Sequence, residues 1–455
     1  MTIKKTLFVF MFALFIRLTY AWFFIDLDSL VLEDQMMYIQ LGKILANTGY
    51  FLQDTGNGFI PVTERLPGYP ALLSLIYTVF GQENIAVVLV QIVIDSLTCV
   101  VIALIAEIVV PSGFIIAGIV AALNLNMVIL SGMILTDTLF LFLFSLFILL
   151  VFYYIKNPSS LKLILLSFVL CTSILVRPVS YYLVFLLLLL LIVFFIWKKV
   201  AFKKIIYSLF LYIIPFVIIF GPIHHKNYHE YSTLSLTSQG GGHALNWIVP
   251  AVYQYSGQGS YQEGKLFAKA KLEDKILLDG FQKSANNPFT NSSYKMQVAK
   301  EALTDLGLFN VLHAWSVGIA VNLLTPSIAN APVVRTMEHP SFYATSGNGI
   351  IDKLINYVTN TNGLVYLLII TIGTVISFSF LIMSIFGFYR MLVLSRYGNN
   401  REIIIFSLFI VSYFLSITGP IIGVKYRLPI EPIMTLYVTY AVNYYLNKKD
   451  NISGA

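Results

Sequence analysis

Long apolar runs are the dominant pattern of the chain. Runs of roughly 20 residues, the length that a helix needs to cross the hydrocarbon of a bilayer, recur along the whole sequence. The runs do not alternate between apolar and polar residues at a period of two, as the strands of a membrane β-barrel do. We therefore predict an all-α polytopic protein with ten membrane-spanning helices, at residues 6–25, 84–108, 113–131, 136–155, 161–177, 179–197, 205–223, 363–389, 402–420 and 428–446.

Two further apolar runs are poor candidates for spans. The run "PGYPALLSLIYTVFG" at 67–81 is short and is bounded by proline and glycine, and the run at 307–327 contains His313 and Pro326. Because such helices are typical of the membrane interface or of re-entrant segments, we expect both runs to be interfacial or re-entrant. The first span contains Arg17 and lacks a small-residue cleavage site, which favours a retained helix over a signal peptide.

Basic residues predict the orientation. The chain is 58% hydrophobic and 11% charged, with 29 Lys and Arg against 22 acids. This excess orients a membrane protein, since basic loops stay cytoplasmic, and we expect no nucleic-acid partner. A cytoplasmic N-terminus places these residues inside: Lys4, Lys5, Lys156, Lys162, Lys198, Lys199, Lys203, Lys204, Arg390, Arg396, Arg401, Lys448 and Lys449. We therefore expect a multi-pass protein of the cell membrane, surrounded by lipid, with both termini cytoplasmic.

The same orientation places two long connections on the extracytoplasmic side. They are the first outer loop, 26–83, and the segment 224–362. The predicted organisation is therefore an N-terminal transmembrane module at 1–223, the extracytoplasmic segment, and C-terminal transmembrane helices at 363–455. The charged stretch within the segment, "KLFAKAKLEDKILLDGFQKS", is typical of a small helical cap.

Several cations lie on the extracytoplasmic side next to spans, against the orientation rule. One interpretation is that they snorkel or pair with acids. The other is a shared anion site, for which arginine suits phosphate because its planar guanidinium donates in pairs. We favour a phosphate site formed by Arg65, Arg177, Lys226, Lys425 and Arg427.

Three acids lie at the same side. Glu33 and Asp34 open the first outer loop, and Asp137 stands in "ILTDTLF" at the start of the fourth span. An acid at the membrane edge indicates function, although Asp34 would also suit a solvated loop and Asp137 a helix cap. Adjacent residues of a helix point about 100° apart, so Glu33 and Asp34 are not expected to act as one pair. Asp34 shares a helical face with Tyr38, and Asp95 in the second span is expected to pack or pair.

The first outer loop contains "EDQMMYIQLGKILANTGYF" and then "ERLPGYPALLSLIYTVFG". These two motifs resemble the first outer loop of the bacterial glycosyltransferase superfamily with the C-type membrane fold. The shared pattern is an acid, a tyrosine four residues later, and a basic-Pro-x-Tyr-Pro element before Phe-Gly. It falls here on Asp34, Tyr38, Arg65, Pro67, Tyr69, Pro70, Phe80 and Gly81. "ILTDTLF", "ILVRP", "GPIHHKNYHEY" and "KYRLPIEP" resemble later motifs in the same order, and the nearest lineage is that of dolichyl-phosphate-mannose protein mannosyltransferases and lipid A aminoarabinose transferases.

The resemblance implies a glycosyltransferase that uses a polyprenyl-phosphate sugar. A hexose or pentose would pass, with inversion, to an extracytoplasmic acceptor: a lipid, a cell-envelope glycan or a protein. Asp34 would be the general base, with Asp137 as the next candidate. Such a transfer needs a carboxylate for the acceptor's proton and fixed cations where phosphate charge develops. Lys226, before Asn227, stands where the superfamily more often has arginine.

A metal is the open alternative at the histidines. His225 and His229 are four residues apart, a spacing at which two imidazoles of a helix face one ligand. The related polyprenyl-phosphate-sugar enzymes work without a metal, so the resemblance implies none, and we expect no cofactor. The imidazoles would then lie at the interface or face the phosphate.

Two other functions fit a polytopic chain with a large outer segment. A flippase for lipid-linked glycans would typically carry internal repeats, and the sequence has none. A polysaccharide polymerase or ligase that uses a diphosphate-linked donor would not be expected to place its acid directly after the first span. We therefore favour the glycosyltransferase.

Overall fold

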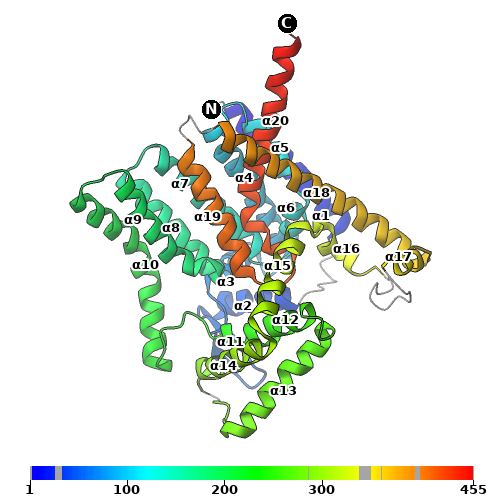
Figure 1. Cartoon of the computed structure of the whole chain (residues 1–455). Helices are drawn as coiled ribbons and strands as arrows, with labels where there is room; N and C mark the ends of the chain where they lie inside the picture. Colours follow the sequence, from blue (N-terminus) through cyan, green and yellow to red (C-terminus); the bar gives the residue numbers. More distant parts are fainter. Residues whose placement is uncertain are drawn as a thin grey trace.

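The computed structural model describes residues 3–25, 33–284, 286–337, 350–359, 361–394 and 400–453. In this part of the chain, seven helices are long and apolar enough to cross a membrane, or up to nine if two bent helix pairs each form a span. The predicted all-α polytopic fold is therefore confirmed (Figure 1). The helices of the bundle are α1 (Ile3–Phe24), α4 (Asn84–Val109), α7 (Asp137–Lys156), α8 (Ser160–Val176), α9 (Tyr181–Trp197), α10 (Phe202–Tyr231), α18 (Thr361–Leu394), α19 (Arg401–Thr418) and α20 (Glu431–Ser453).

The predicted third span is broken in the structure. Helices α5 (Phe114–Ala122) and α6 (Leu125–Ser131) meet at an angle of 56°. The side chain of Asn124 accepts hydrogen bonds from the amides of Asn126 and Met127, and so caps α6. An asparagine that bonds the backbone two and three residues on is a helix-start signal, which explains why a continuous apolar run does not form one helix.

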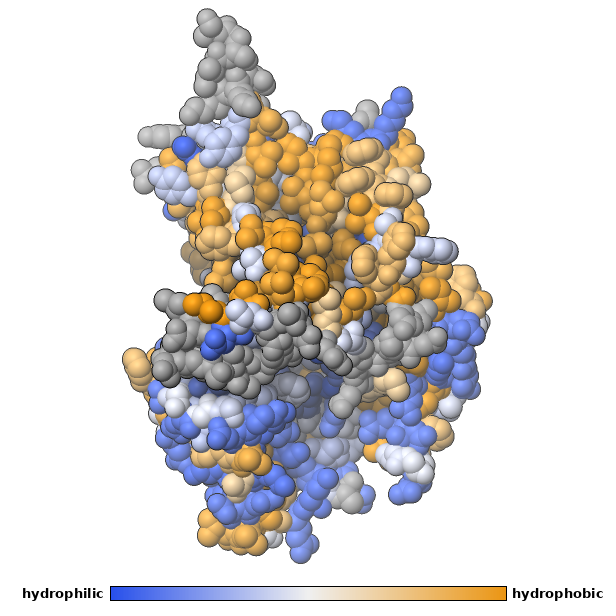
Figure 2. Space-filling model, turned by 90° about the vertical axis from the view of Figure 1, so that its right-hand side faces the viewer, coloured by the Kyte–Doolittle hydropathy of each residue, from blue (hydrophilic) through white to orange (hydrophobic). Residues whose placement is uncertain are grey.

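The termini lie at one end of the bundle, and the polar elements lie at the other, which we call the cap end (Figure 1). In Figure 2, apolar surface covers the bundle and hydrophilic surface covers much of the cap end. The surface is therefore divided between an apolar bundle and a largely hydrophilic cap end. The cap end holds α2 (Glu33–Thr48), the antiparallel strands β1 (Leu52–Asp54) and β2 (Phe59–Pro61), α3 (Gly68–Phe80), α11 (Gly240–His243), η2 (Ala244–Ile248), α12 (Val249–Tyr255), α13 (Tyr261–Asp279) and α14 (Pro288–Leu306).

The cap helices have a small core of their own. Buried alanine, valine and leucine side chains from η2, α12, α13 and α14 pack together, apart from the main core of the bundle. Helix α15 (Leu308–Leu324) follows α14 at a bend of 101° and leads back toward the bundle. The remaining elements are five short ones and one longer helix: η1 (Pro178–Ser180), η3 (Ser327–Asn330), α16 (Pro332–Arg335), η5 (Val424–Tyr426), η6 (Leu428–Ile430) and α17 (Ile350–Thr359).

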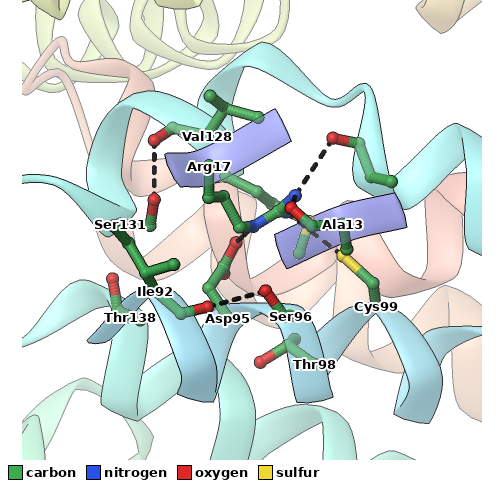
Figure 3. A network of polar contacts seen from close by, with 12 residues as sticks. Ala13, Arg17, Ile92, Asp95, Ser96, Thr98, Cys99, Val128, Ser131 and Thr138 are labelled. Atoms are coloured by element: carbon green, nitrogen blue, oxygen red, sulfur yellow. Dashed lines mark hydrogen bonds and ion pairs between the residues drawn. The ribbon is translucent and has the colours of Figure 1, made fainter. Parts of the chain in front are cut away.

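A buried ion pair joins the first helix to the second span. Arg17 of α1 donates from Nε to Asp95 of α4, and both side chains are buried (Figure 3). Arg17 Nη1 also donates to the carbonyl of Ala122 at 3.1 Å, and Nη2 lies 3.1 Å from Cys99 Sγ. Since Ala122 ends α5, the guanidinium satisfies a carbonyl that the break leaves without a helical partner. The expected pairing of Asp95 is confirmed, and the pair fixes α1 against α4 and α5.

Candidate active site

Asp34 lies between two cations at the cap end. Its Oδ1 is 3.7 Å from Nη2 of Arg65, and its Oδ2 is 3.9 Å from Nζ of Lys425. The residues come from α2, the loop before α3, and η5 (Val424–Tyr426) between α19 and α20. Both distances exceed a hydrogen-bond length, and the Asp34 side chain is 49% exposed. The structure thus brings together two of the predicted cations and the predicted base, with the carboxylate open to solvent.

Contacts with the loop before α7 and with α3 hold the start of α2. The amide of Ile134 donates to Gln35 Oε1 at 2.9 Å, which links α2 to the loop before α7. The ring of Tyr38 packs edge-on against Tyr69 of α3, with centroids 5.2 Å apart. The hydroxyl of Tyr69 in turn donates to Gln91 of α4 at 2.6 Å. These contacts fix the backbone that carries the candidate base. The Glu33 side chain lies outside the described residues.

Asp137 is paired rather than capping its helix. It is buried in the first turn of α7 and forms an ion pair with Arg177, the residue that follows α8. Thr136 holds the N-cap position, and its side chain makes no capping bond. The guanidinium carbon of Arg177 lies 5.8 Å from the ring centroid of Phe140, a cation–π distance. Asp137 is therefore compensated by its own partner, whereas Asp34 is exposed.

Tyr38 connects the two ion pairs electrostatically. Burial raises the pKa of its hydroxyl, and the positive charges of Arg65 and Arg177 partly oppose that shift. The carboxylates of Asp34 and Asp137 act in the same direction as burial. All four charges act on one hydroxyl, which stays protonated at neutral pH. Both ion pairs therefore lie within electrostatic reach of the Tyr38 hydroxyl.

Arg427 is enclosed in the turn between α19 and α20. Its Nε donates to Glu431 Oε1 at 2.8 Å, and its Nη1 donates to the carbonyl of Leu323 at 2.7 Å. Its Nη2 lies 3.4 Å from the hydroxyl of Ser327. Each guanidinium nitrogen thus has a protein partner, and both members of the Arg427–Glu431 pair are buried. This placement suits a residue that shapes the turn better than one that meets a donor phosphate.

The remaining predicted cation, Lys226, lies near the end of α10. Its Nζ is 3.9 Å from Glu230 Oε2, one turn further along the helix, and both side chains are about half exposed. Asn227 is buried and donates from Nδ2 to the carbonyl of Ser235 at 2.9 Å. Asn227 therefore fixes the chain that leaves α10, and its amide is committed to that contact.

The two histidines on the same helix form a close pair. The ring centroids of His225 and His229 are 4.4 Å apart. Within the described ranges, no group of three or more His, Cys, Asp or Glu side chains is arranged to hold a metal ion. The metal alternative thus has two candidate ligands and no third.

His243, which was not predicted, lies within electrostatic reach of two of the site's cations. Burial lowers its pKa, and the positive charges of Lys425 and Arg65 lower it further. It ends α11, which packs against α14 through a glycine: a Cβ at Gly241 would lie 1.7 Å from the carbonyl oxygen of Ser292. The glycine-rich stretch "GGGH" was a signal for close backbone packing, but it did not reveal which residues the imidazole would face.

Comparisons with known proteins identify the fold. No protein-family model and no curated protein sequence matches the chain. The structure is similar to the oligosaccharyltransferase AglB from Archaeoglobus fulgidus in complex with an inhibitory peptide and a dolichol-phosphate, with a TM-score of 0.53, 13% identity and coverage of 98% of this chain and 50% of that chain. For an A. fulgidus oligosaccharyltransferase tethered to an acceptor peptide the TM-score is 0.51, with 14% identity and coverage of 97% and 50%. ArnT from Cupriavidus metallidurans in the apo state gives 0.38, with 11% identity and coverage of 96% and 76%.

The chain shares its fold with the A. fulgidus oligosaccharyltransferase structures. The predicted resemblance to the C-type fold is thereby confirmed at the level of architecture. The chain spans about half the length of the oligosaccharyltransferase chains that it matches.

Proposed function

We propose that the chain is an integral membrane glycosyltransferase that moves a monosaccharide from a polyprenyl-phosphate donor to an extracytoplasmic acceptor. The sugar is a hexose or pentose, and the acceptor is a lipid, a cell-envelope glycan or a protein. The observation that carries the proposal is the exposed carboxylate of Asp34, held between Arg65 and Lys425 at the polar end of an apolar bundle. A lipid-linked substrate reaches such a place with its tail in the membrane and its phosphate at the surface.

The distances around Asp34 suit a phosphate that arrives beside it. At 3.7 and 3.9 Å, the carboxylate does not take up the hydrogen-bond donors of Arg65 or Lys425. Both cations therefore keep hydrogen-bond donors that a phosphate oxygen can engage. Arginine and lysine at fixed positions stabilise negative charge as it develops on a leaving phosphate. This assigns donor binding to Arg65 and Lys425.

The reaction then needs one proton acceptor and one leaving group. Asp34 accepts the proton of the acceptor hydroxyl while the oxygen of that hydroxyl attacks the anomeric carbon of the donor sugar. The bond from that carbon to the phosphate oxygen breaks, and polyprenyl phosphate leaves with the electron pair. Attack from the side opposite the phosphate inverts the anomeric configuration. The proton ends on Asp34, and the new glycosidic bond ends on the acceptor.

Asp137 and Arg177 support this centre through their ion pair. Asp137 is buried, Arg177 is largely buried, and the pair joins α7 to the residue that follows α8. The pair lies within electrostatic reach of Tyr38, whose hydroxyl stays protonated. We assign Tyr38 to hydrogen bonding of the donor, and the Asp137–Arg177 pair to holding α7 and α8 together.

The architecture supports the same assignment. One AglB structure that this fold resembles is a complex with a dolichol-phosphate, which is a polyprenyl-type phosphate. Because the identity is 13%, the likeness supports the fold directly and the donor class by extension. The sugar and the acceptor classes rest on the sequence resemblance.

Purified protein in lipid nanodiscs tests the proposal. It should release polyprenyl phosphate from a monosaccharide donor and pass the labelled sugar to an envelope acceptor fraction. Arg65→Ala should lower kcat/KM for the donor roughly 100- to 1000-fold, as expected when one stabilising charge of an active site is removed. Lys265→Ala, at a basic side chain of cap helix α13, is the matched control and should leave the rate unchanged. Donor translocation without release, or use of a diphosphate-linked donor alone, would contradict the proposal.

A further inference from the structure

The turn that carries Lys425 has little regular structure of its own. Between α19 and α20 the chain passes through Gly419, whose φ is +63°, and then through two short 3₁₀ turns, η5 and η6. Such a segment leaves many backbone groups without a helical partner. The position of the Lys425 ammonium therefore depends on contacts from other elements.

One face of α15 supplies these contacts. Trp315 Nε1 donates to the carbonyl of Ser416 at 3.1 Å, just before the turn. Gly318, three residues on, lies so close that a Cβ there would be 2.5 Å from the carbonyl oxygen of Gly419. Asn322 follows at the next turn of the helix, on the same face. The turn is thus packed along α15 over three successive positions.

Asn322 binds the turn with both ends of its amide. Its Nδ2 donates to the carbonyl of Ile421 at 2.9 Å, and its Oδ1 accepts from the amide of Gly423 at 2.8 Å. The side chain is buried. A buried amide that uses its donor and its acceptor on one backbone segment fixes that segment in position and direction.

A second asparagine holds the next residue. Asn126 of α6 donates from Nδ2 to the carbonyl of Val424 at 3.1 Å. The backbone groups at Ile421, Gly423 and Val424 are therefore bound by side chains from two different helices, directly before Lys425. No contact between Asn322 and Asp34 is found in the described part of the chain, so any effect of Asn322 on that site passes through the turn.

We propose that Asn322 is a positioning residue for the donor phosphate, acting through the Lys425 turn. The proposal rests on the proposed function, in which Lys425 binds that phosphate. It also gives α15 a role, since α15 continues from the cap helix α14 across a 101° bend. The outer cap is in this way joined mechanically to one of the two cations of the site.

A double-mutant cycle on phosphate binding tests the proposal. The probe is a short-chain polyprenyl phosphate, titrated into the full-length protein in nanodiscs. Asn322→Leu should weaken binding to about the same extent as Lys425→Ala, roughly 10- to 100-fold, the range for loss of one hydrogen bond to a charged group. In the Lys425→Ala background, Asn322→Leu should add little, because both changes remove the same interaction.

The matched control is Asn310→Leu. Asn310 lies on the same helix, but its Nδ2 donates to the carbonyl of Leu306 within one turn, so this change should leave binding unaltered. If Asn322→Leu does not fold, Asn322→Ala is used in its place. The smaller side chain leaves a space that can hold a water, and the turn loses the two hydrogen bonds of the asparagine amide.

Three results would overturn the proposal. Wild-type binding in the Asn322 variant, with weak binding in Lys425→Ala, would remove the role of Asn322 and leave the proposed function standing. Full additivity of the two changes would indicate a general structural effect of Asn322. Wild-type binding in Lys425→Ala would remove Lys425 from the phosphate site, and with it this part of the proposed function.

Discussion

The carboxylate of Asp137 is buried and forms an ion pair with the largely buried Arg177, whereas the carboxylate of Asp34 is about half exposed. The two acids lie at the same end of the bundle, yet their surroundings differ in kind. A paired, buried carboxylate is poorly placed to take a proton from an incoming acceptor. An exposed carboxylate that lies beyond hydrogen-bond distance of its two neighbouring cations is well placed to do so. This contrast separates the structural acid from the proposed catalytic one.

The buried pair predicts a stability effect. Asp137→Asn should lower the free energy of unfolding by on the order of 3 kcal/mol, because it leaves the charge of Arg177 uncompensated. The thermal unfolding midpoint of the purified protein measures this. The control is Asp305→Asn, which breaks an exposed pair with Lys271 and should cost about 1 kcal/mol or less. Equal midpoints for the two variants would contradict the assigned role of Asp137.

The lowered pKa of His243 predicts a pH dependence of stability. Burial and the two nearby cations favour its neutral form in the folded state. The contribution of neutral His243 to the free energy of unfolding is therefore fully present above the ordinary histidine pKa of about 6.5. This contribution is lost as the pH falls through the lower pKa of the folded state. Between pH 8 and pH 5, the wild-type unfolding midpoint should fall further than that of His243→Gln. Parallel curves of unfolding midpoint against pH for the two proteins would contradict the lowered pKa of His243.

The orientation of the bundle predicts a labelling pattern. Both native cysteines are buried, so they should react little with the reagent, and the labelling of an introduced cysteine can be measured directly. Asn57→Cys in the first outer loop and Gln282→Cys after α13 should react with an impermeant thiol reagent in intact spheroplasts. Lys203→Cys, at the start of α10, should react only after lysis. The reverse pattern would place the site on the cytoplasmic side and would exclude the proposed acceptors.

Much of the architecture was predictable because membrane spans leave a strong signal. The run 136–155 corresponds to α7 (Asp137–Lys156), and the charged cap stretch is helical as expected. The break after Ala122 was missed, since the apolar run continues through it, although the capping asparagine at Asn124 was a local signal. Hydropathy reports how apolar a run is, whereas the break between α5 and α6 is set by the capping hydrogen bonds of the Asn124 side chain.

The site was predictable only in part, because its parts meet through tertiary packing. Sequence motifs named Asp34, Arg65 and Lys425, and the structure places them together. Arg427 was grouped with them, although a glutamate four residues on was visible as its partner. Asn322 carried no signal, since its partners lie about a hundred residues away in the chain.

Single-turnover transfer by Asp34→Asn is the most direct test of the proposal that Asp34 is the general base. The change keeps the shape of the side chain but removes the carboxylate that accepts the proton. Release of polyprenyl phosphate from a bound monosaccharide donor should fall at least roughly 100-fold, within the range for loss of a general base, while donor binding is retained. Asp274→Asn, at an exposed acid of α13, should behave as wild type. Transfer by Asp34→Asn at the wild-type rate would contradict the central claim, and the base would then have to be sought elsewhere, first at Asp137.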